Sequence, residues 1–486
     1  MEINEFLNKA NEGYNLVPII EEIESFDKEA IDVYSNHFDK KKSFFFESLE
    51  GDKNWSRYTI IGCSSGDFIE IYGDKIHKYS DFSCDKVIQD PNPIRWLEEY
   101  AKEFNAFIPD NLPSFSGGFV GHFSFESICY FEESVKRKKQ KNDINAPDIS
   151  LIVCKDFIVF DKTQNKVFIV VFSDCLKKDY ENSKSKVNEY KKLLMTDIDA
   201  NVVTRINQTT EVKYDFSKGE FLSAVEQIKN YITNGDVMQV VLSQRMTIDF
   251  SEKPIDFYRE LRQINPSPYM YYLNMGEYTV VGSSPEILVR LEDKKVTVRP
   301  IAGTRPRGTD KETDKNYEID LVNDKKELAE HLMLIDLGRN DIGRICETGS
   351  VVLTDKMIIE RYSHVMHMVS NVEGIIKPKY SLFDVLKATF PAGTVSGAPK
   401  IRALQIIFEL ENITRGIYAG AIGYLGWNGN MDTAIAIRTC VIKSERLHIQ
   451  CGAGIVYDSV PESEWDETIS KGKAIIKAVE RLRNKT

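Results

Sequence analysis

The sequence of 486 residues has no apolar run that approaches the roughly 20 residues of a membrane span. Its first residues, 1–5, are acidic and lack the basic and then apolar pattern of an export signal. The eight cysteines form neither a CxxC pair nor a Cys/His cluster of zinc spacing. We therefore expect a soluble cytoplasmic protein with reduced thiols and no zinc site.

Positive charge is also scarce, because 63 Lys and Arg stand against 74 Asp and Glu and give a net charge of −11. Such a balance repels polyphosphates and anionic membrane surfaces, so neither nucleic acid nor a membrane is expected as a partner. The GxSxG elbow of serine hydrolases and the GxxxxGK[ST] phosphate-binding loop are absent as well. Covalent hydrolase chemistry and nucleoside triphosphate hydrolysis are therefore disfavoured.

The composition is that of a folded globular protein, with 42% hydrophobic and 28% charged residues. Between residues 41 and 172 the pattern predicts mostly strands, at 44–49, 68–72, 149–153, 157–160 and 167–172. Residues 195–215 are polar and aperiodic and are the best linker candidate. We place a boundary there, between an N-terminal region of residues 1–205 and a C-terminal domain of residues 206–486.

The C-terminal domain begins with a helix signal. Ser217 to Glu220 is a capping box, and an apolar stripe at spacings of 4, 3 and 4 follows it. Strands expected at 237–242, 269–273, 279–281, 287–291 and 296–298 then alternate with helices near 324–337, 399–411 and 463–482. This order predicts an α+β fold with large antiparallel sheets and flanking helices.

Two of these helices carry a carboxylate pair at spacing i, i+3, which places both side chains on one helix face. The pairs are Glu327 with Glu330 and Glu464 with Glu467, and Lys471 lies one turn further on. Each pair alone is typical of a solvated face, and Glu467 with Lys471 of an ordinary ion pair. Two acidic pairs that meet across a cleft would instead suit Mg²⁺, which prefers oxygen ligands.

Three further segments suggest a binding cavity. The pattern of residues 431–438 predicts a strand that places two alanines and Arg438 on one face. This face could be the floor of a cavity with one cation, or the strand could be an edge strand with an exposed arginine. Gly452 and Gly454 interrupt another strand where a ligand or another backbone could approach closely. Thr394 precedes a helix start that suits an anion, although it could equally be a local cap.

Taken together, the ordered motifs resemble those of the chorismate-utilising enzymes. They are Pro300 to Gly308, His331 to Asp341, Pro391 to Lys400, Cys451 to Ile455 and Glu464 to Lys471. Within that family the sequence is similar to the large, synthase subunits of anthranilate synthases, which form anthranilate and pyruvate in the first committed step of tryptophan biosynthesis. The motifs are dense over residues 215–486 and less specific over the N-terminal third.

The resemblance implies a role for each candidate residue. Glu330 and Glu467 would bind Mg²⁺ directly, together with the ring carboxylate of chorismate, and Glu327 and Glu464 would bind the waters of the ion. The acid–base residues of the family match Glu286 and His367. Residues that contact or line the substrate site would be Thr304, Thr394, Tyr418, Arg438, Gly452, Gly454 and Lys471.

Two positions distinguish branches of the family. Aminodeoxychorismate synthases carry a nucleophilic lysine where this sequence has Ala302, and isochorismate and salicylate synthases carry a water-activating lysine where it has Gln239. Ammonia is therefore the expected nucleophile, supplied by a separate glutaminase (glutamine amidotransferase) subunit in a hetero-oligomer. The alternatives are an aminodeoxychorismate-forming homologue without its lysine, an enzyme that stops at the aminated intermediate, and a catalytically silent tryptophan-sensing subunit.

The resemblance also implies a feedback site for tryptophan between the two parts of the chain. Phe45-Phe46-Glu47-Ser48 resembles an inhibitor motif of the family, and Asn265 to Tyr271 resembles the segment that faces it. The inhibitor-binding residues would be Glu47, Ser48, Asn265, Pro266, Met270 and Tyr271. The alternative is a plain buried strand and a Pro-rich turn.

Overall fold

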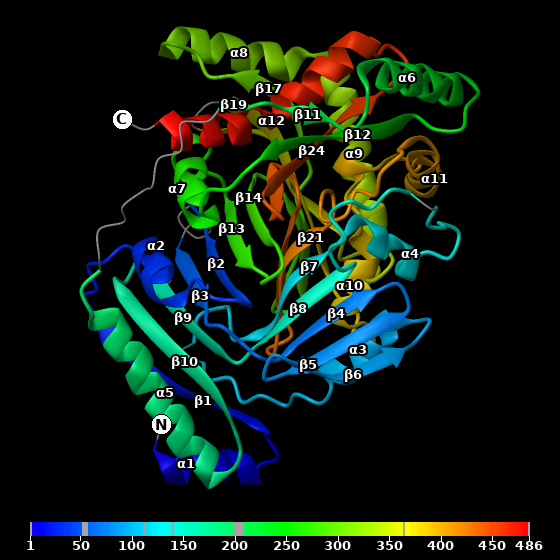
Figure 1. The fold of residues 1–486 in the computed structure, drawn as a ribbon. Coiled ribbons are helices and arrows are strands. Elements are labelled where there is room, and N and C mark those ends of the chain that lie inside the picture. The colour runs from blue at the N-terminus through cyan, green and yellow to red at the C-terminus, as the bar shows by residue number, and fades with distance from the viewer. Residues whose placement is uncertain are drawn as a thin grey trace.

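Two large antiparallel sheets organise the computed structural model, which describes residues 2–50, 57–110, 112–138, 140–198, 209–362 and 365–484 (Figure 1). Within these residues each sheet has 12 strands. The first sheet runs in the order β1 (Leu16–Glu24), β10 (Lys166–Asp174), β9 (Asp156–Asp161), β3 (Tyr58–Gly62), β2 (Ser43–Glu47), β13 (Tyr269–Asn274), β14 (Thr279–Ser284), β23 (Thr439–Lys443), β24 (Arg446–Ile455), β12 (Gln239–Asp249) and β11 (Lys213–Tyr214), and β20 (Gly397–Ala398) pairs with β12.

The second sheet runs in the order β17 (Ile301–Pro306), β19 (Val365–Ile375), β16 (Lys295–Val298), β15 (Ile287–Glu292), β22 (Met431–Ile435), β21 (Ala421–Gly426), β7 (Gly118–Phe123), β8 (Ile149–Cys154), β4 (Phe68–Tyr72), β5 (Lys75–Ser80) and β6 (Ser83–Gln89), and β18 (Val352–Arg361) pairs with β19. The α+β prediction with large antiparallel sheets is therefore confirmed. Both sheets contain strands from each side of the predicted boundary. The boundary itself, at residue 205, lies outside the described residues, and the division stays a prediction.

The longer helices are α1 (Ile3–Asn11), α3 (Pro93–Ala101), α5 (Lys177–Met195), α6 (Lys218–Thr233), α7 (Pro254–Ile264), α8 (Lys311–Asn323), α9 (Lys325–Gly343), α10 (Leu382–Thr389), α11 (Lys400–Leu410) and α12 (Pro461–Asn484). Short helical turns are α2 (Ala30–Val33), η1 (Tyr34–Phe38), η2 (Phe125–Ser127), α4 (Ile128–Phe131) and η3 (Gly393–Val395). Figure 1 shows α1 and α5 at one end of the molecule and α6, α8 and α12 at the opposite end. None of the helices in the described part of the chain is long and apolar enough to cross a bilayer.

Local signals explain the start of α6. The Ser217 hydroxyl accepts from the backbone N–H of Glu220, while the Glu220 carboxylate accepts from the backbone N–H of Ser217, as the predicted capping box requires. The apolar stripe then buries Phe221, Val225 and Ile228. This helix was predicted from the sequence and is confirmed.

The strand predicted over residues 431–438 is too long. β22 ends at Ile435, and Arg438 adopts a φ of 51°, in the left-handed region that regular extended backbone does not use. Regular alternation of side chains therefore stops before Arg438. The two alanines, Ala434 and Ala436, are fully buried in an apolar cluster with Ile422 and do not line the cavity described below.

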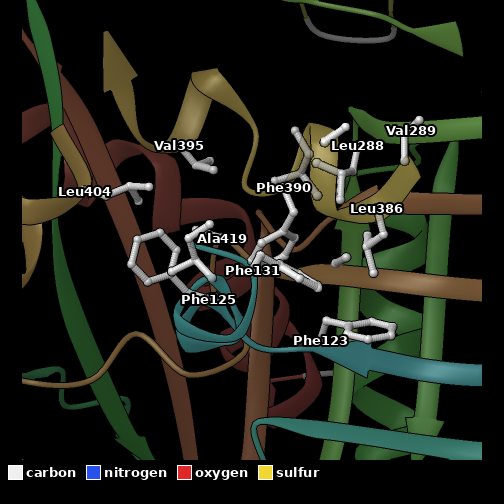
Figure 2. Packing of buried hydrophobic residues seen from close by; sticks show 14 of the residues in the cluster. Phe123, Phe125, Phe131, Leu288, Val289, Leu386, Phe390, Val395, Leu404 and Ala419 are labelled. Carbon is white, nitrogen blue, oxygen red and sulfur yellow. The ribbon is translucent and has the colours of Figure 1, made fainter. Parts of the chain in front are cut away.

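The two parts of the chain share their apolar cores. Figure 2 shows Phe123, Phe125 and Phe131 of the N-terminal region among residues of the C-terminal domain, including Phe390. The rings of Phe131 and Phe390 lie 5.6 Å apart in an edge-on arrangement. Burial of this apolar surface joins the sheets that carry the candidate site.

Candidate active site

One cavity of about 590 Å³ lies beside α9, α12 and the ends of several strands. All thirteen residues that the sequence assigns to catalysis, substrate binding and metal binding line it: Glu286, Thr304, Glu327, Glu330, His367, Thr394, Tyr418, Arg438, Gly452, Gly454, Glu464, Glu467 and Lys471. They come from elements up to 185 residues apart in the chain. Their convergence makes this cavity the candidate active site.

The two carboxylate pairs enter the cavity from different helices. Glu327 and Glu330 lie on α9, and Glu464 and Glu467 lie on α12. Glu330 accepts a hydrogen bond of 2.9 Å from the amide Nε2 of Gln239, and Glu467 forms a 2.8 Å ion pair with Lys471. Both helices therefore present oxygen atoms to the same space.

These carboxylates fit a hard divalent cation. Burial raises the pKa of Glu327, and repulsion by Glu330 adds to the shift; burial likewise raises the pKa of Glu464, and Glu467 adds to it. A cation would relieve this excess of negative charge. The described residues contain no group of three or more His, Cys, Asp or Glu side chains that could hold a metal ion. Mg²⁺ commonly takes one or two carboxylates and keeps several waters.

Glu286 provides a candidate proton donor. It lies between β14 and β15, almost completely buried, and its Oε1 accepts a 3.1 Å hydrogen bond from the hydroxyl of Thr394. Burial raises the pKa of Glu286 to about 8, because the ionised form loses its hydration. The carboxyl group is therefore mostly protonated at neutral pH.

His367 is held in one tautomer. Its Nδ1 lies 3.2 Å from the carbonyl oxygen of Gly303 and 3.0 Å from the hydroxyl of Thr304. Because a carbonyl can only accept, this geometry assigns the hydrogen to Nδ1 and leaves a lone pair on Nε2. Burial lowers the pKa of His367, so the imidazole is neutral and Nε2 can accept a proton.

Arg438 is the candidate anion-binding cation of the cavity. It is half-buried, and its guanidinium has no ion-pair partner within the described part of the chain. A Cβ on Gly452 would stand 2.7 Å from the hydroxyl of Tyr418, and one on Gly454 would stand 2.5 Å from Nε2 of Gln239. A side chain at Gly452 would therefore clash with Tyr418 and the backbone of Leu242, whereas one at Gly454 would displace the end of the Gln239 side chain.

The structure adds one contact that sequence reasoning missed. Arg305 on β17 donates to Asp324 and Glu327 and also pairs with Asp320, so it fixes the start of α9 beside the cavity. Arg305 lies inside the Pro300 to Gly308 motif, which was the available signal. Its pairing with three acids could not be read from the sequence, because it depends on how β17 packs against two helices.

A second cavity, of about 330 Å³, lies between the two parts of the chain. Of the six residues predicted to bind an inhibitor, Glu47, Ser48, Met270 and Tyr271 line it, whereas Asn265 and Pro266 do not. Asn265 instead donates a 2.6 Å hydrogen bond to the hydroxyl of Ser283.

Two carboxylates in the wall of the second cavity already have cationic partners. Glu47 accepts 2.8 Å hydrogen bonds from Tyr258 and Arg262. A second carboxylate, Asp432, pairs with Arg290 at the cavity wall. Sequence reasoning missed Asp432, since its strand pattern suggested only the active-site face.

Known proteins resemble this chain over nearly its whole length. A family model described as chorismate binding enzyme matches residues 47–477. The chain is 45% identical to anthranilate synthase component 1 of Pseudomonas aeruginosa over 485 residues, which are 99% of this chain and 98% of that protein. It is 44% identical to the protein of the same name from Aquifex aeolicus, over 98% of this chain and 97% of that one.

Solved structures give the same result at the level of fold. Anthranilate synthase component I from Streptococcus pneumoniae superposes with a TM-score of 0.79 at 37% identity and covers 94% of this chain and 99% of its own. The menaquinone-specific isochorismate synthase MenF from Escherichia coli superposes with a TM-score of 0.72, over 99% of this chain and 100% of its own. At 17% identity, the second likeness concerns the fold alone.

Proposed function

Because the chain belongs to the chorismate binding enzyme family, we propose that it acts as an anthranilate synthase component 1 and converts chorismate and ammonia to anthranilate, pyruvate and water. The observation that carries this proposal is the meeting of Glu286, His367, Arg438 and two carboxylate pairs in one cavity. These groups match the needs of the reaction: a proton donor, a base, an anion site and a site for a divalent cation.

The proposed cofactor is Mg²⁺, held by Glu330 and Glu467 with Glu327 and Glu464 on its waters. When bound, the ion supplies positive charge beside the ring carboxylate of chorismate. Arg438 binds the enolpyruvyl carboxylate, since a guanidinium without a carboxylate partner can clamp an incoming one. Lys471 donates to the carbonyl of Gly452 at 2.9 Å and keeps that wall in place.

The proposed proton transfers involve Glu286 and His367. Glu286 donates its proton to the leaving hydroxyl as ammonia adds at the far end of the diene, and water departs. Loss of a ring proton to Nε2 of His367 then expels the side chain as enolpyruvate and makes the ring aromatic. Enolpyruvate takes up the proton that the added ammonium group releases and becomes pyruvate. The raised pKa of Glu286 and the lowered pKa of His367 keep both groups in the required state at neutral pH.

The choice of nucleophile follows from two side chains in the cavity wall. Ala302 offers no amine for a covalent intermediate, and the amide of Gln239 has no useful basicity for activating water. Nε2 of Gln239 is moreover committed to Glu330. The nucleophile is therefore external ammonia, delivered by a separate glutaminase subunit.

The proposed regulator is tryptophan, bound in the second cavity. Met270 and Tyr271 offer apolar surface to an indole, and Glu47 and Ser48 offer polar groups to an amino acid. Glu47 accepts from Arg262 at both carboxylate oxygens and from Tyr258 at Oε1, so an incoming ammonium group would share Oε2 with Arg262.

Product analysis tests the proposed function. The pure chain is incubated with chorismate, Mg²⁺ and ammonium at mildly alkaline pH, and the products are identified and counted. We expect anthranilate and pyruvate in equal amounts, and neither when ammonium is left out. Isochorismate or aminodeoxychorismate as the main product would assign the chain to another branch, and tryptophan binding without turnover would indicate a silent sensor.

A further inference from the structure

The backbone around Arg438 is held by hydrogen bonds from the next residue, Thr439, and from the neighbouring strand β14. Arg438 lies between β22 and β23 with a φ of 51°, a conformation that residues with a Cβ adopt at a cost and that persists only where neighbours fix it. The neighbours that matter are those that bind the carbonyl groups of Ile437 and Arg438, since these two peptide units set the direction of the arginine side chain.

The first of these bonds comes from a pair of hydroxyl groups. The hydroxyl of Thr439 donates to the carbonyl of Ile437 at 2.8 Å, and the hydroxyl of Tyr271 lies 2.6 Å from Thr439 Oγ1. The hydrogen of Thr439 is committed to the carbonyl, so Tyr271 is the donor to Thr439. A chain of two hydrogen bonds thus runs from Tyr271 to the peptide that precedes Arg438.

The pair meets across an intervening strand. Tyr271 on β13 lies opposite Gly282 on β14, and Gly282 lies opposite Thr439 on β23. A Cβ on Gly282 would stand 2.2 Å from the ring of Tyr271 and 2.7 Å from Thr439 Oγ1. Only glycine at this position lets the tyrosine reach the threonine.

The second bond comes from the next residue of β14. The backbone N–H of Ser283 donates to the carbonyl of Arg438 at 3.1 Å, and the Ser283 hydroxyl accepts from the amide of Asn265. Both ends of the segment from Asn265 to Tyr271 therefore support the turn. Asn265 acts on the carbonyl of Arg438 through Ser283, and Tyr271 acts on the carbonyl of Ile437 through Thr439.

We propose that Tyr271 and Thr439 are positioning residues for Arg438, which they hold in the conformation that binds the enolpyruvyl carboxylate. This inference rests on the proposed function of Arg438. It gives Tyr271 two roles, because the same side chain also lines the second cavity. Tyr271, in the wall of the second cavity, thereby fixes the turn that places Arg438 in the active-site cavity.

Two nearly isosteric variants and their combination test the pair. Tyr271→Phe removes one hydroxyl, and Thr439→Val removes the other. For each variant we expect the KM for chorismate to rise about five-fold, the factor that corresponds to one net hydrogen bond, with kcat within about two-fold of the wild type. Because both changes break the same chain of bonds, the double variant is expected to match the single ones rather than multiply their effects.

Tyr278→Phe is the matched control. Tyr278 is also buried and its hydroxyl lies 2.6 Å from Nε2 of His122, far from the Arg438 turn in the bonding network. We expect its KM to equal that of the wild type, even if its thermal stability falls. A wild-type KM in Tyr271→Phe and Thr439→Val, multiplied effects in the double variant, or an equal KM rise in Tyr278→Phe would overturn the inference.

The experiments distinguish a wrong proposed function from a wrong inference about Tyr271 and Thr439. If the wild type forms no anthranilate from chorismate and ammonia, the proposed function is wrong and the inference falls with it. If the wild type is active while the two hydroxyl variants keep its KM, only the inference is wrong. Thermal unfolding of each variant shows whether it is folded before its kinetics are interpreted, and Thr439→Val replaces Tyr271→Phe if the latter does not fold.

Discussion

At the scale of single residues, burial gives ordinary side chains the protonation states that the chemistry needs. Glu286 is enclosed, and its hydrogen bonds with the hydroxyl of Thr394 and the backbone at Ile301 do not offset the cost of burying its charge, so its neutral form is favoured. His367 is enclosed beside the carbonyl of Gly303, so its neutral form is favoured too. A carboxylic acid that keeps its proton and an imidazole that lacks one form an acid and base pair at the same pH.

The first prediction concerns Glu286→Gln. Turnover is expected to fall by at least about 100-fold, because the amide cannot donate a proton. In the wild type kcat should decline as pH rises through about 8, where Glu286 ionises. Steady-state rates from pH 6 to 10, on the wild type and on the exposed control Glu312→Gln, measure both effects; a flat profile above pH 8 contradicts the assignment.

Stability gives the same variant an independent readout. The folded pKa of Glu286 lies above its ordinary value of 4.5, so the folded state holds a proton that the unfolded state releases. Its contribution is therefore complete below about pH 4.5 and is lost as pH rises toward 8. Glu286→Gln has no such pH-dependent contribution to lose. Its melting temperature should therefore rise relative to that of the wild type as pH increases from 4.5 to about 8.

The second prediction concerns Glu330→Gln, which removes one charge at nearly constant shape. The fold should persist, because the amide can still pair with Gln239. Turnover should collapse at Mg²⁺ concentrations that saturate the wild type, since a carboxylate oxygen of the proposed ligand set is lost. Asp336→Asn, an exposed change on the same helix, is the control. Full activity of Glu330→Gln at the original Mg²⁺ requirement would contradict the metal assignment.

At the scale of elements, the sequence predicted the features that depend on residues close together in the chain. The capping box and stripe of α6 and the alternation of β4 were readable because both depend on residues close in the chain. The end of β22 was not readable, because the turn at Arg438 is held by Tyr271 and Ser283 from distant strands. The residue pattern of 431–438 continues through the turn, so the sequence does not show that the strand ends at Ile435.

The third prediction tests a local signal directly. Ser217→Ala removes the cap of α6 and is expected to lower the free energy of unfolding by about 1 kcal/mol. Ser217→Asp, which keeps an acceptor at the cap, should change it less. Urea unfolding curves of both variants provide the measurement, and kcat should stay unchanged because α6 does not line the active-site cavity. An unchanged midpoint for Ser217→Ala would show that the cap is not used in solution.

At the scale of the whole molecule, the two parts of the chain share both sheets. Met270 on β13 pairs with Glu47 on β2, more than two hundred residues earlier. The sequence pattern predicted that both segments are strands, but not that they are partners. The family motifs named candidate residues that the structure brings into one cavity, while the placement of Asn265 and Asp432 required the structure.

The last prediction follows from this shared architecture. β22 carries Asp432 in the wall of the second cavity and leads into the Arg438 turn of the first, so a ligand in one cavity is expected to change affinity in the other. Coupling of binding free energies is reciprocal, so chorismate must weaken tryptophan binding by the factor by which tryptophan weakens chorismate binding. Ser48→Phe should fill the second cavity and abolish tryptophan inhibition while uninhibited turnover stays intact. Calorimetry with tryptophan on both proteins, alongside steady-state rates, measures these effects. Undiminished tryptophan binding by the variant would place the inhibitor site elsewhere, and no binding by the wild type would mean that this chain lacks the feedback function.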